Sequence, residues 1–342
     1  MTDPLLEVRD LKVSFRTDDG VVRAVDGVSL TLDEGETLGI VGESGSGKSV
    51  TMMSVMRLIT DPNAQFSGEV FYKGRDLMKL NQGQIRSIRG SGIGMIFQDP
   101  MTSLNPVYKV GWQIAEQIRA HEQVSAAAAR DRAIQLLTAV GIPQASRRVD
   151  DYPHHFSGGM RQRVMIAMAV SCNPDVLIAD EPTTALDVTI QAQILKLIRK
   201  LKEDFGTAVV LITHDMGVVA DMADRIAVMY AGKIIEQGTG RDLFYDPQHP
   251  YTWGLLGSIA RLDRPRPRRL AAIPGLPPSL LRLPAGCAFS DRCGHRFDHC
   301  ATQPELSART GTLHLDACHL SPEQKKDLRV ATIHPELVPE TP

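Results

Sequence analysis

Residues 42–49 have the composition and spacing of a loop that binds the phosphates of a nucleotide. An apolar run at 38–41 precedes the loop and a helix-compatible stretch at 50–59 follows it, in the order of strand, loop and helix that this motif requires. Glycines let such a backbone curl until successive N–H groups point at one anion, and the N-terminus of the following helix adds partial positive charge. The predicted nucleotide-binding residues are Gly42, Glu43, Ser44, Gly45, Ser46, Gly47, Lys48 and Ser49.

Lys48 and Ser49 carry the side chains of this loop that can act on a triphosphate. A lysine in this place would reach the β- and γ-phosphates, and the hydroxyl beside it would coordinate Mg²⁺. An ordinary glycine-rich turn can match such a motif by chance, but the flanking strand and helix patterns favour the functional interpretation. The loop therefore predicts binding and hydrolysis of ATP with Mg²⁺.

Two adjacent carboxylates, Asp180 and Glu181, follow the apolar run at 176–179. This pattern is typical of a buried parallel strand that presents carboxylates at its C-terminal edge. Beside a triphosphate the two side chains would have different roles. We expect Asp180 to order Mg²⁺ and Glu181 to polarise the water that attacks the γ-phosphate.

Gln98 and His214 are the other candidate catalytic residues. Gln98 follows residues 95–97, and His214 ends the apolar run at 209–213. Gln98 is predicted to contact Mg²⁺ and the attacking water, and His214 to hold the γ-phosphate. Either residue alone would more often be structural, and it is their order along the chain with the other groups that favours a catalytic role.

The remaining pattern describes the elements that would position these groups. Apolar and polar residues alternate near the N-terminus, which predicts half-buried antiparallel strands. Helical spacing over 111–140 predicts an inserted helical subdomain, and helical spacing over 190–201 precedes a buried strand at 208–213. Strands that alternate with helices form a parallel sheet covered by helices. The alternating N-terminal residues are Leu6, Val8, Leu11, Val13 and Phe15.

Phe15 has two interpretations. It lies 27 residues before Gly42 and could be the aromatic side chain on which adenine stacks. It could equally be a strand aromatic that packs into the core. Phe15 is therefore a candidate adenine contact.

Composition excludes several classes of function. The 342 residues suggest about two domains, and the 38 basic and 40 acidic residues give a net charge of −2, so no excess of basic residues points to nucleic acid as a partner. No apolar stretch approaches the ~18 residues of a membrane helix, and the N-terminus lacks the features of a signal peptide. These observations predict a cytoplasmic protein.

Four of the five cysteines lie in the last 60 residues, separated by five, six and seventeen residues. In a reducing compartment, thiolates this close together predict a soft-metal site. Zinc sites favour pairs two to four residues apart, so the spacing argues mildly against zinc, although nearby histidines could complete a zinc site, and unligated cysteines are a further alternative. The fifth cysteine, Cys172, is expected in the core. The cluster cysteines are Cys287, Cys293, Cys300 and Cys318, and the neighbouring histidines are His295, His299, His314 and His319.

Residues 261–269 contain five arginines and two prolines. This composition predicts an extended, solvated linker between domains. Contact with anionic lipid headgroups near a membrane partner is the alternative.

The stretch Ser157, Gly158 and Gly159, followed by residues 160–163, makes a resemblance specific. Together with the phosphate loop, the two carboxylates, Gln98, His214 and Asp187 in this order, it resembles the ATP-binding cassette (ABC) ATPases over roughly residues 5–240. The resemblance implies that Ser157, Gly158 and Gly159 bind the γ-phosphate held by the phosphate loop of a second ATPase subunit. ATP would then join two subunits head to tail, and Asp187 would belong to the nucleotide site.

The family form of this stretch is Leu-Ser-Gly-Gly-Gln, whereas this chain has Phe156 and Met160 at its two ends. Loss of the glutamine removes a polar contact without affecting the hydroxyl and backbone donors that face phosphate. The resemblance implies an α/β fold: an ABC-type P-loop NTPase with a mixed or parallel sheet core, an antiparallel β-subdomain, an inserted helical subdomain and a small C-terminal cysteine-rich domain. We place the nucleotide-binding domain at 1–255, its helical subdomain at about 99–173, and the C-terminal extension at 256–342.

Three further stretches, at 99–106, 246–252 and 273–275, look like those of the ATPase subunits of dipeptide and oligopeptide importers. In such importers two ATPase subunits, often non-identical, lie under two membrane-spanning subunits, and an extracytoplasmic binding protein delivers the cargo. This implies a peripheral protein at the cytoplasmic face of the inner membrane. Similar subunits carry a [4Fe–4S] cluster on such cysteines, and this cluster is the predicted cofactor besides ATP and Mg²⁺, with zinc as the alternative.

Three other functions stay open at this stage. The same machinery could move another cargo, such as nickel, because specificity would reside in the binding protein and channel. A soluble ABC ATPase of translation or DNA repair would normally have two fused cassettes or a long coiled-coil insertion, and the sequence has neither. An iron–sulfur redox or assembly protein that uses ATP would need labile, exposed cysteines.

Overall fold

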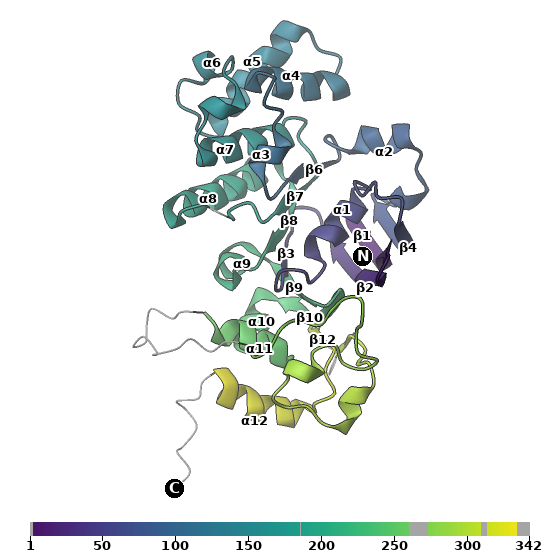
Figure 1. Ribbon diagram of the computed structural model, residues 1–342. Coiled ribbons are helices and arrows are strands. Elements are labelled where there is room, and N and C mark those ends of the chain that lie inside the picture. The colour runs from purple at the N-terminus through teal and green to yellow at the C-terminus, as the bar shows by residue number, and fades with distance from the viewer. Residues whose placement is uncertain (1–2, 185, 260–272, 309–312, 334–342) are drawn as a thin grey trace. The chain divides into compact units, whose positions relative to one another are not determined.

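The computed structural model describes residues 3–184, 186–259, 273–308 and 313–333, so the predicted arginine-rich linker at 261–269 lies outside the described residues (Figure 1). Its contacts divide the chain into two compact units, and each unit combines segments that are far apart in the sequence. The first unit comprises Met1–Glu7, Thr31–Thr37 and Phe71–Ile212, and the second comprises Val8–Leu30, Leu38–Val70 and Thr213–Pro342.

Three parallel strands form the sheet of the first unit. β6 (Ile93–Ile96) pairs with β7 (Val176–Asp180), and β7 pairs with β8 (Ala208–Thr213). All residues of these strands are buried, which explains why the strands have continuous apolar sequences rather than alternating ones. The predicted strand that ends at the two carboxylates and the predicted strand at 208–213 are both confirmed.

The helical part of the first unit lies between β6 and β7 in the sequence (Figure 1). The helical pattern predicted over 111–140 forms two helices, because the chain turns at 122–125 and the Ser125 side chain accepts a hydrogen bond from the Ala128 N–H to begin the second. Cys172 is buried after the last of these helices, as predicted. The helices are α3 (Pro100–Ser103), α4 (Val110–His121), α5 (Ala126–Ala139), α6 (Ala145–Arg148) and α7 (Gly158–Ala169).

The N-terminal strands β2 (Gly20–Leu32), β1 (Leu6–Thr17) and β4 (Ala64–Tyr72) are neighbours in that order. In β1 the side chains of Val8, Leu11 and Val13 are buried. The spacing of three between the first two arises because Asp10 adopts a left-handed backbone conformation, with φ of 45°, which shifts the alternation by one residue.

The larger sheet of the second unit is mixed. β3 (Thr37–Val41) runs parallel to β9 (Arg225–Tyr230), and β9 pairs antiparallel with β10 (Lys233–Thr239). β10 in turn pairs with β12 (Leu315–Asp316), which pairs with β11 (Ser307–Ala308). The C-terminal segment thus extends the sheet next to the phosphate loop, and a separate C-terminal domain beginning at residue 256 is not confirmed.

The other described elements of the two units are β5 (Arg75–Asp76), η1 (Leu77–Lys79), α2 (Gln82–Ile88), η2 (Pro153–His155), α8 (Val188–Phe205), α1 (Lys48–Val55), α9 (Met216–Met222), α10 (Gly240–Tyr245), α11 (Pro250–Gly257), η3 (Ser290–Arg292), η4 (Asp298–Ala301) and α12 (Pro322–Ile333). Among the described residues, no helix combines the length and apolar character needed to span a membrane.

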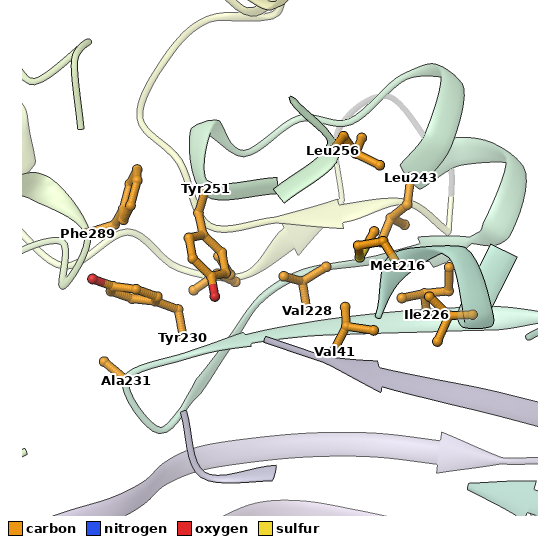
Figure 2. Packing of buried hydrophobic residues seen from close by; sticks show 12 residues of the cluster. Val41, Met216, Ile226, Val228, Tyr230, Ala231, Leu243, Tyr251, Leu256 and Phe289 are labelled. Atoms are coloured by element: carbon orange, nitrogen blue, oxygen red, sulfur yellow. The ribbon is translucent and has the colours of Figure 1, made fainter. Parts of the chain in front are cut away.

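A core of apolar side chains joins the C-terminal segment to this sheet (Figure 2). Tyr230 at the end of β9, Tyr251 of α11 and Phe289 just before η3 are each buried and contact one another, with ring centroids 4.7–5.4 Å apart. Aromatic pairs at these distances add to the stabilisation that burial gives. The ring of Phe289 therefore anchors η3 against β9 and α11.

Phe289→Ala should lower the free energy of unfolding of the second unit by about 3 kcal/mol, because it removes a buried ring and leaves a cavity. Urea unfolding can be followed by the fluorescence of the buried Trp253 in a Trp112→Phe background, which leaves Trp253 as the single tryptophan. Tyr245→Ala is the matched control, since Tyr245 lies in the same unit but is 82% exposed. Equal midpoints for the two variants would contradict the anchoring role of Phe289.

Candidate functional site

The phosphate loop turns sharply between β3 and α1. Gly42, Gly45 and Gly47 all have positive φ angles, of 154°, 78° and 101°. A Cβ atom on Gly42 would lie 2.2 Å from the Met229 carbonyl oxygen of β9, and one on Gly47 would lie 2.4 Å from the Ala24 carbonyl oxygen of β2. Two glycines are thus required by the close approach of neighbouring strands as well as by the turn itself.

Lys48 lies against the main chain of this loop. Its side chain is buried, and Nζ donates hydrogen bonds to the carbonyl oxygens of Gly42 (2.8 Å) and Glu43 (2.9 Å). The ammonium group is therefore already held where the loop curls, and phosphate oxygens are chemically equivalent acceptors for it. Ser49 follows it in the first turn of α1.

α1 begins at Lys48 and ends at Val55, whereas the sequence pattern indicated a helix at 50–59. Gly47 is the residue before the helix, so the loop runs directly into its first turn. The helix ends early because Arg57 adopts a left-handed conformation, with φ of 50°, and the Leu58 N–H bonds to the Met53 carbonyl.

The first unit holds the two carboxylates at the end of β7. Asp180 is buried. Glu181 follows with a positive φ of 46°, which is unusual for a residue other than glycine, and its N–H donates to the Ile212 carbonyl of β8 at 2.9 Å. Strain of this kind is maintained only where surrounding contacts fix the residue.

Three side chains supply such contacts around Glu181. The predicted catalytic residue Gln98 donates from Nε2 to Glu181 Oε2 at 3.0 Å, and the Thr184 hydroxyl donates to the same oxygen at 2.8 Å. Gln162, buried in α7, donates to the Pro182 carbonyl at 2.7 Å and so holds the following turn. Sequence reasoning missed Thr184 and Gln162. Only the position of Thr184, three residues after Glu181, could have suggested its role.

The Ser-Gly-Gly stretch begins α7. The Ser157 side chain accepts a hydrogen bond from the Met160 N–H at 3.4 Å, while Ser157 and Gly158 are exposed and Gly159 packs against Ile190 of α8. Phe156, which replaces the leucine of the family pattern, is buried. An apolar side chain at that position anchors the start of the helix, so leucine and phenylalanine meet the same requirement.

Asp187 is the N-cap residue of α8, as Ser157 is of α7. Its side chain accepts from the Ile190 N–H at 2.9 Å. The Ser-Gly-Gly stretch, Asp187 and Gln98 belong to the first unit. The phosphate loop, Phe15 and His214 belong to the second. His214 is exposed between β8 and α9, and Phe15 is half-buried in β1. Their proposed contacts with nucleotide stay predictions.

The four C-terminal cysteines line one small cavity of about 20 Å³ in the second unit. Burial raises the pKa of the Cys287 thiol, that of Cys293 to about 11 and that of Cys318 to about 12, so these three thiols are protonated at neutral pH. The Cys287 N–H donates to the Cys300 carbonyl at 3.0 Å, which brings these two segments together.

The predicted metal cluster is not supported by this arrangement. In the described part of the chain, no three His, Cys, Asp or Glu side chains are arranged so that they could hold a metal ion. Of the histidines proposed as alternative ligands, His295 and His319 line the cavity. His314 instead bonds the buried carboxylate of Glu236 at 2.8 Å, and His249, which the sequence did not suggest, lines the cavity.

Residues 25–184 match a family described as ABC transporter, and residues 235–300 match a family described as oligopeptide/dipeptide transporter, C-terminal region. The second match includes the C-terminal segment that carries three of the four cluster cysteines. Both parts of the chain therefore have recognised counterparts.

The chain is 57% identical to the oligopeptide transport ATP-binding protein OppD of Bacillus subtilis, over 85% of this chain and 82% of that protein. It is 54% identical to the dipeptide transport ATP-binding protein DppD of the same organism, over 87% and 89% of the two chains. The structure is similar to that of a dimeric ATP-binding cassette in a post-hydrolysis state bound to ADP and Pi, with a TM-score of 0.62, 28% identity, and coverage of 69% and 99%.

The fold and the phosphate loop define a P-loop ATPase of the cassette type. The chain belongs to the ABC transporter family, and within it to the ATP-binding proteins of oligopeptide and dipeptide transporters.

Gly42→Ala should destabilise the nucleotide-free second unit far more than Gly45→Ala. Both substitutions place alanine at a positive φ, which costs roughly 1 kcal/mol or more, but only Gly42 faces a carbonyl oxygen that a Cβ would overlap. A Cβ atom added to Gly45 would have no such neighbour within 4 Å. Unfolding followed through Trp253 checks this difference, and equal losses of stability would contradict the importance of the approach to β9.

Proposed function

We propose that this protein is the ATP-hydrolysing subunit of a membrane importer for oligopeptides or dipeptides. The observation that carries the proposal is the glycine loop with Lys48 at the start of α1, in a chain more than half identical to ATP-binding proteins of peptide transporters. The chain would supply the energy, while partner membrane subunits would form the path for the cargo.

ATP would bind with its phosphates on the amides of residues 42–49. Lys48 would exchange its loop carbonyls for phosphate oxygens, and Phe15 would stack on adenine. Ser49, Gln98 and Asp180 would hold Mg²⁺, which neutralises phosphate charge when it is bound. His214 would hold the γ-phosphate.

Glu181 is the residue that would orient the attacking water. Its carboxylate accepts hydrogen bonds from Gln98 and Thr184 at Oε2, which fixes the orientation of the group that would act as the base. A carboxylate fixed in this way loses little freedom when the reaction begins.

A second ATPase subunit, identical or homologous, would complete the site. Ser157, Gly158 and Gly159 would bind the γ-phosphate of the nucleotide held by that subunit, which is supported by the exposure of the first two at the N-terminus of the twelve-residue α7. Asp187 would lie beside them at the start of α8. Two membrane-spanning subunits and, through them, an extracytoplasmic binding protein would be the other partners, with this chain peripheral at the cytoplasmic face of the inner membrane and no role for nucleic acid.

Glu181→Gln should reduce ATP hydrolysis by roughly 100-fold or more while ATP binding is retained, because the substitution keeps size and hydrogen bonding but removes the base. The measurement is phosphate release by the complex with its membrane subunits, alongside uptake of a labelled dipeptide and oligopeptide panel by cells that lack the chromosomal copy. Glu203→Gln, at an exposed position of α8, is the matched control.

Uptake restored by the original chain and by Glu203→Gln, but not by Glu181→Gln, would support an ATP-driven peptide importer. Full hydrolysis by Glu181→Gln would remove the assigned base. Hydrolysis without peptide uptake would transfer the assignment to another cargo, such as nickel or a further small solute.

We also propose that Cys287, Cys293, Cys300 and Cys318 hold a soft metal centre, for which a [4Fe–4S] cluster is the first candidate and zinc the second. The support is that four thiols with no disulfide among them line one cavity. Their cavity of about 20 Å³ is the size of one water molecule, so binding a four-iron cluster requires these segments to move apart.

Protein purified without oxygen should contain about four iron atoms and matching sulfide per chain if the cluster forms. Cys318→Ser should lose the iron, while Cys172→Ser, which replaces the cysteine outside the group, should keep it. Elemental analysis and visible absorbance measure both. Zinc at about one atom per chain would select the alternative, and metal-free, fully folded protein would exclude a metal centre.

A further inference from the structure

The C-terminal segment contacts the phosphate loop through the side chain of one loop residue, Glu43. The Glu43 carboxylate forms a salt bridge with Arg292 of η3, which lies 249 residues further along the chain. Both terminal nitrogens of the guanidinium take part, with NH1 2.6 Å from Oε2 and NH2 2.9 Å from Oε1. This bidentate geometry fixes the orientation of the Glu43 carboxylate as well as its distance from Arg292.

Arg292 is itself held rigidly. Its side chain is only 5% exposed, compared with 29% for Glu43. Nε donates to the Pro274 carbonyl at 2.9 Å, NH1 donates to the Tyr230 hydroxyl at 3.3 Å, and the guanidinium lies over the rings of Tyr230 and Phe289. Because the aromatic core holds the arginine from several sides, its charge has a fixed position from which it can orient Glu43.

The backbone of Glu43 is held as well. Its N–H donates to the Tyr251 hydroxyl at 2.8 Å, and Tyr251 is fully buried in α11. The Tyr251 N–H in turn donates to Nδ1 of His249, whose burial lowers its pKa to about 3, so that this ring stays a neutral acceptor at neutral pH. The Tyr251 hydroxyl therefore projects from a fixed support.

Glu43 also connects to the residue that would contact phosphate. Its carbonyl oxygen accepts from Lys48 Nζ at 2.9 Å and from the Ser46 N–H at 3.2 Å. The carboxylate, N–H and carbonyl of this one residue thus link η3 and α11 to the curl of the loop and to its lysine. A shift of Glu43 would move the carbonyls that orient Lys48.

We propose that Arg292 and Tyr251 are positioning residues of the nucleotide site, which hold the phosphate loop through Glu43 in the shape that accepts a triphosphate. The proposal rests on the proposed function, since it assigns these residues to ATP binding. The C-terminal segment then contributes to nucleotide affinity without touching the nucleotide. Pre-organisation of this kind raises affinity because the loop does not have to be ordered when the ligand arrives.

The alternative is that the Glu43–Arg292 pair only fastens the C-terminal segment to the sheet. Both roles predict some loss of stability when the pair is broken. Only the positioning role predicts a loss of ATP affinity in protein that is still folded, with the same loss for either partner and no further loss for the pair.

The test measures the affinity of the full-length protein for Mg²⁺-ATP, together with its unfolding through Trp253. Glu43→Gln and Arg292→Ala should each weaken ATP binding about tenfold, which corresponds to 1.4 kcal/mol, and the double variant should be no weaker than the single ones. Arg292→Lys keeps the charge but not the bidentate geometry and should recover part of the affinity. Tyr251→Phe, which removes one hydroxyl, should also weaken binding.

Arg296→Ala is the matched control, since Arg296 lies four residues beyond Arg292 and pairs with the exposed Asp291 rather than with the loop. It should bind ATP as the original chain does. If Arg292→Ala does not fold, Glu43→Gln and Tyr251→Phe decide the question, because each keeps the size of its side chain.

Unchanged ATP affinity in folded Glu43→Gln would overturn the positioning role, and so would additive losses in the double variant. Failure of the original chain to bind ATP at all would instead refute the proposed function. The two failures are therefore distinguishable in one series of titrations.

Discussion

The phosphate loop depends on how closely neighbouring backbones approach it. Gly42 lies against the Met229 carbonyl and Gly47 against that of Ala24. The backbones of β9 and β2 therefore leave no room for side chains at these two positions of the loop. The Gly232 N–H also donates to the Ser46 carbonyl at 3.0 Å. The parallel pairing of β3 with β9 brings Met229 beside the start of the loop. A loop with side chains at these positions could not occupy the same space.

The carboxylate end of the first unit uses another kind of constraint. Glu181 has an unfavourable backbone angle that hydrogen bonds from Gln98 and Thr184, and the bond of its own N–H to Ile212, hold in place. Gln162 fixes the next turn from α7. The helix that begins with the Ser-Gly-Gly stretch is thus connected to the turn after β7 by a buried hydrogen bond, and a movement of one requires an adjustment of the other.

The sequence predicted those parts of the fold that local pattern determines. Buried strands read as continuous apolar runs, so β7 and β8 could be placed to within a residue, and the phosphate loop had a motif of its own. The helical spacing over 111–140 indicated helices there without placing the boundary between α4 and α5, which Ser125 marks by beginning α5.

The C-terminal segment could not be predicted in the same way. A shift in composition suggested a separate domain, but β12 pairs with β10 through backbone groups that leave no trace in side-chain pattern. Likewise, nothing about Glu43 or Arg292 alone indicates that they meet across 249 residues. Cysteine spacing indicated that four thiols would be near one another, and they do line one cavity, although in the described part of the chain they would have to rearrange before they could hold a metal ion.

The use of a charged pair at this junction has a physical consequence. Burying an arginine and a carboxylate costs solvation that their attraction only partly recovers, so such a pair adds little stability beyond what apolar side chains of equal volume would give. The pair differs from apolar packing because it fixes an orientation. Two parallel hydrogen bonds hold the carboxylate in one plane, whereas apolar surfaces can shift along each other. The Tyr251 hydroxyl fixes the adjacent peptide group in the same manner. Because the carbonyl of that same residue orients Lys48, the junction determines the position of the loop to within the tolerance of a hydrogen bond, which is the accuracy that recognition of a phosphate requires.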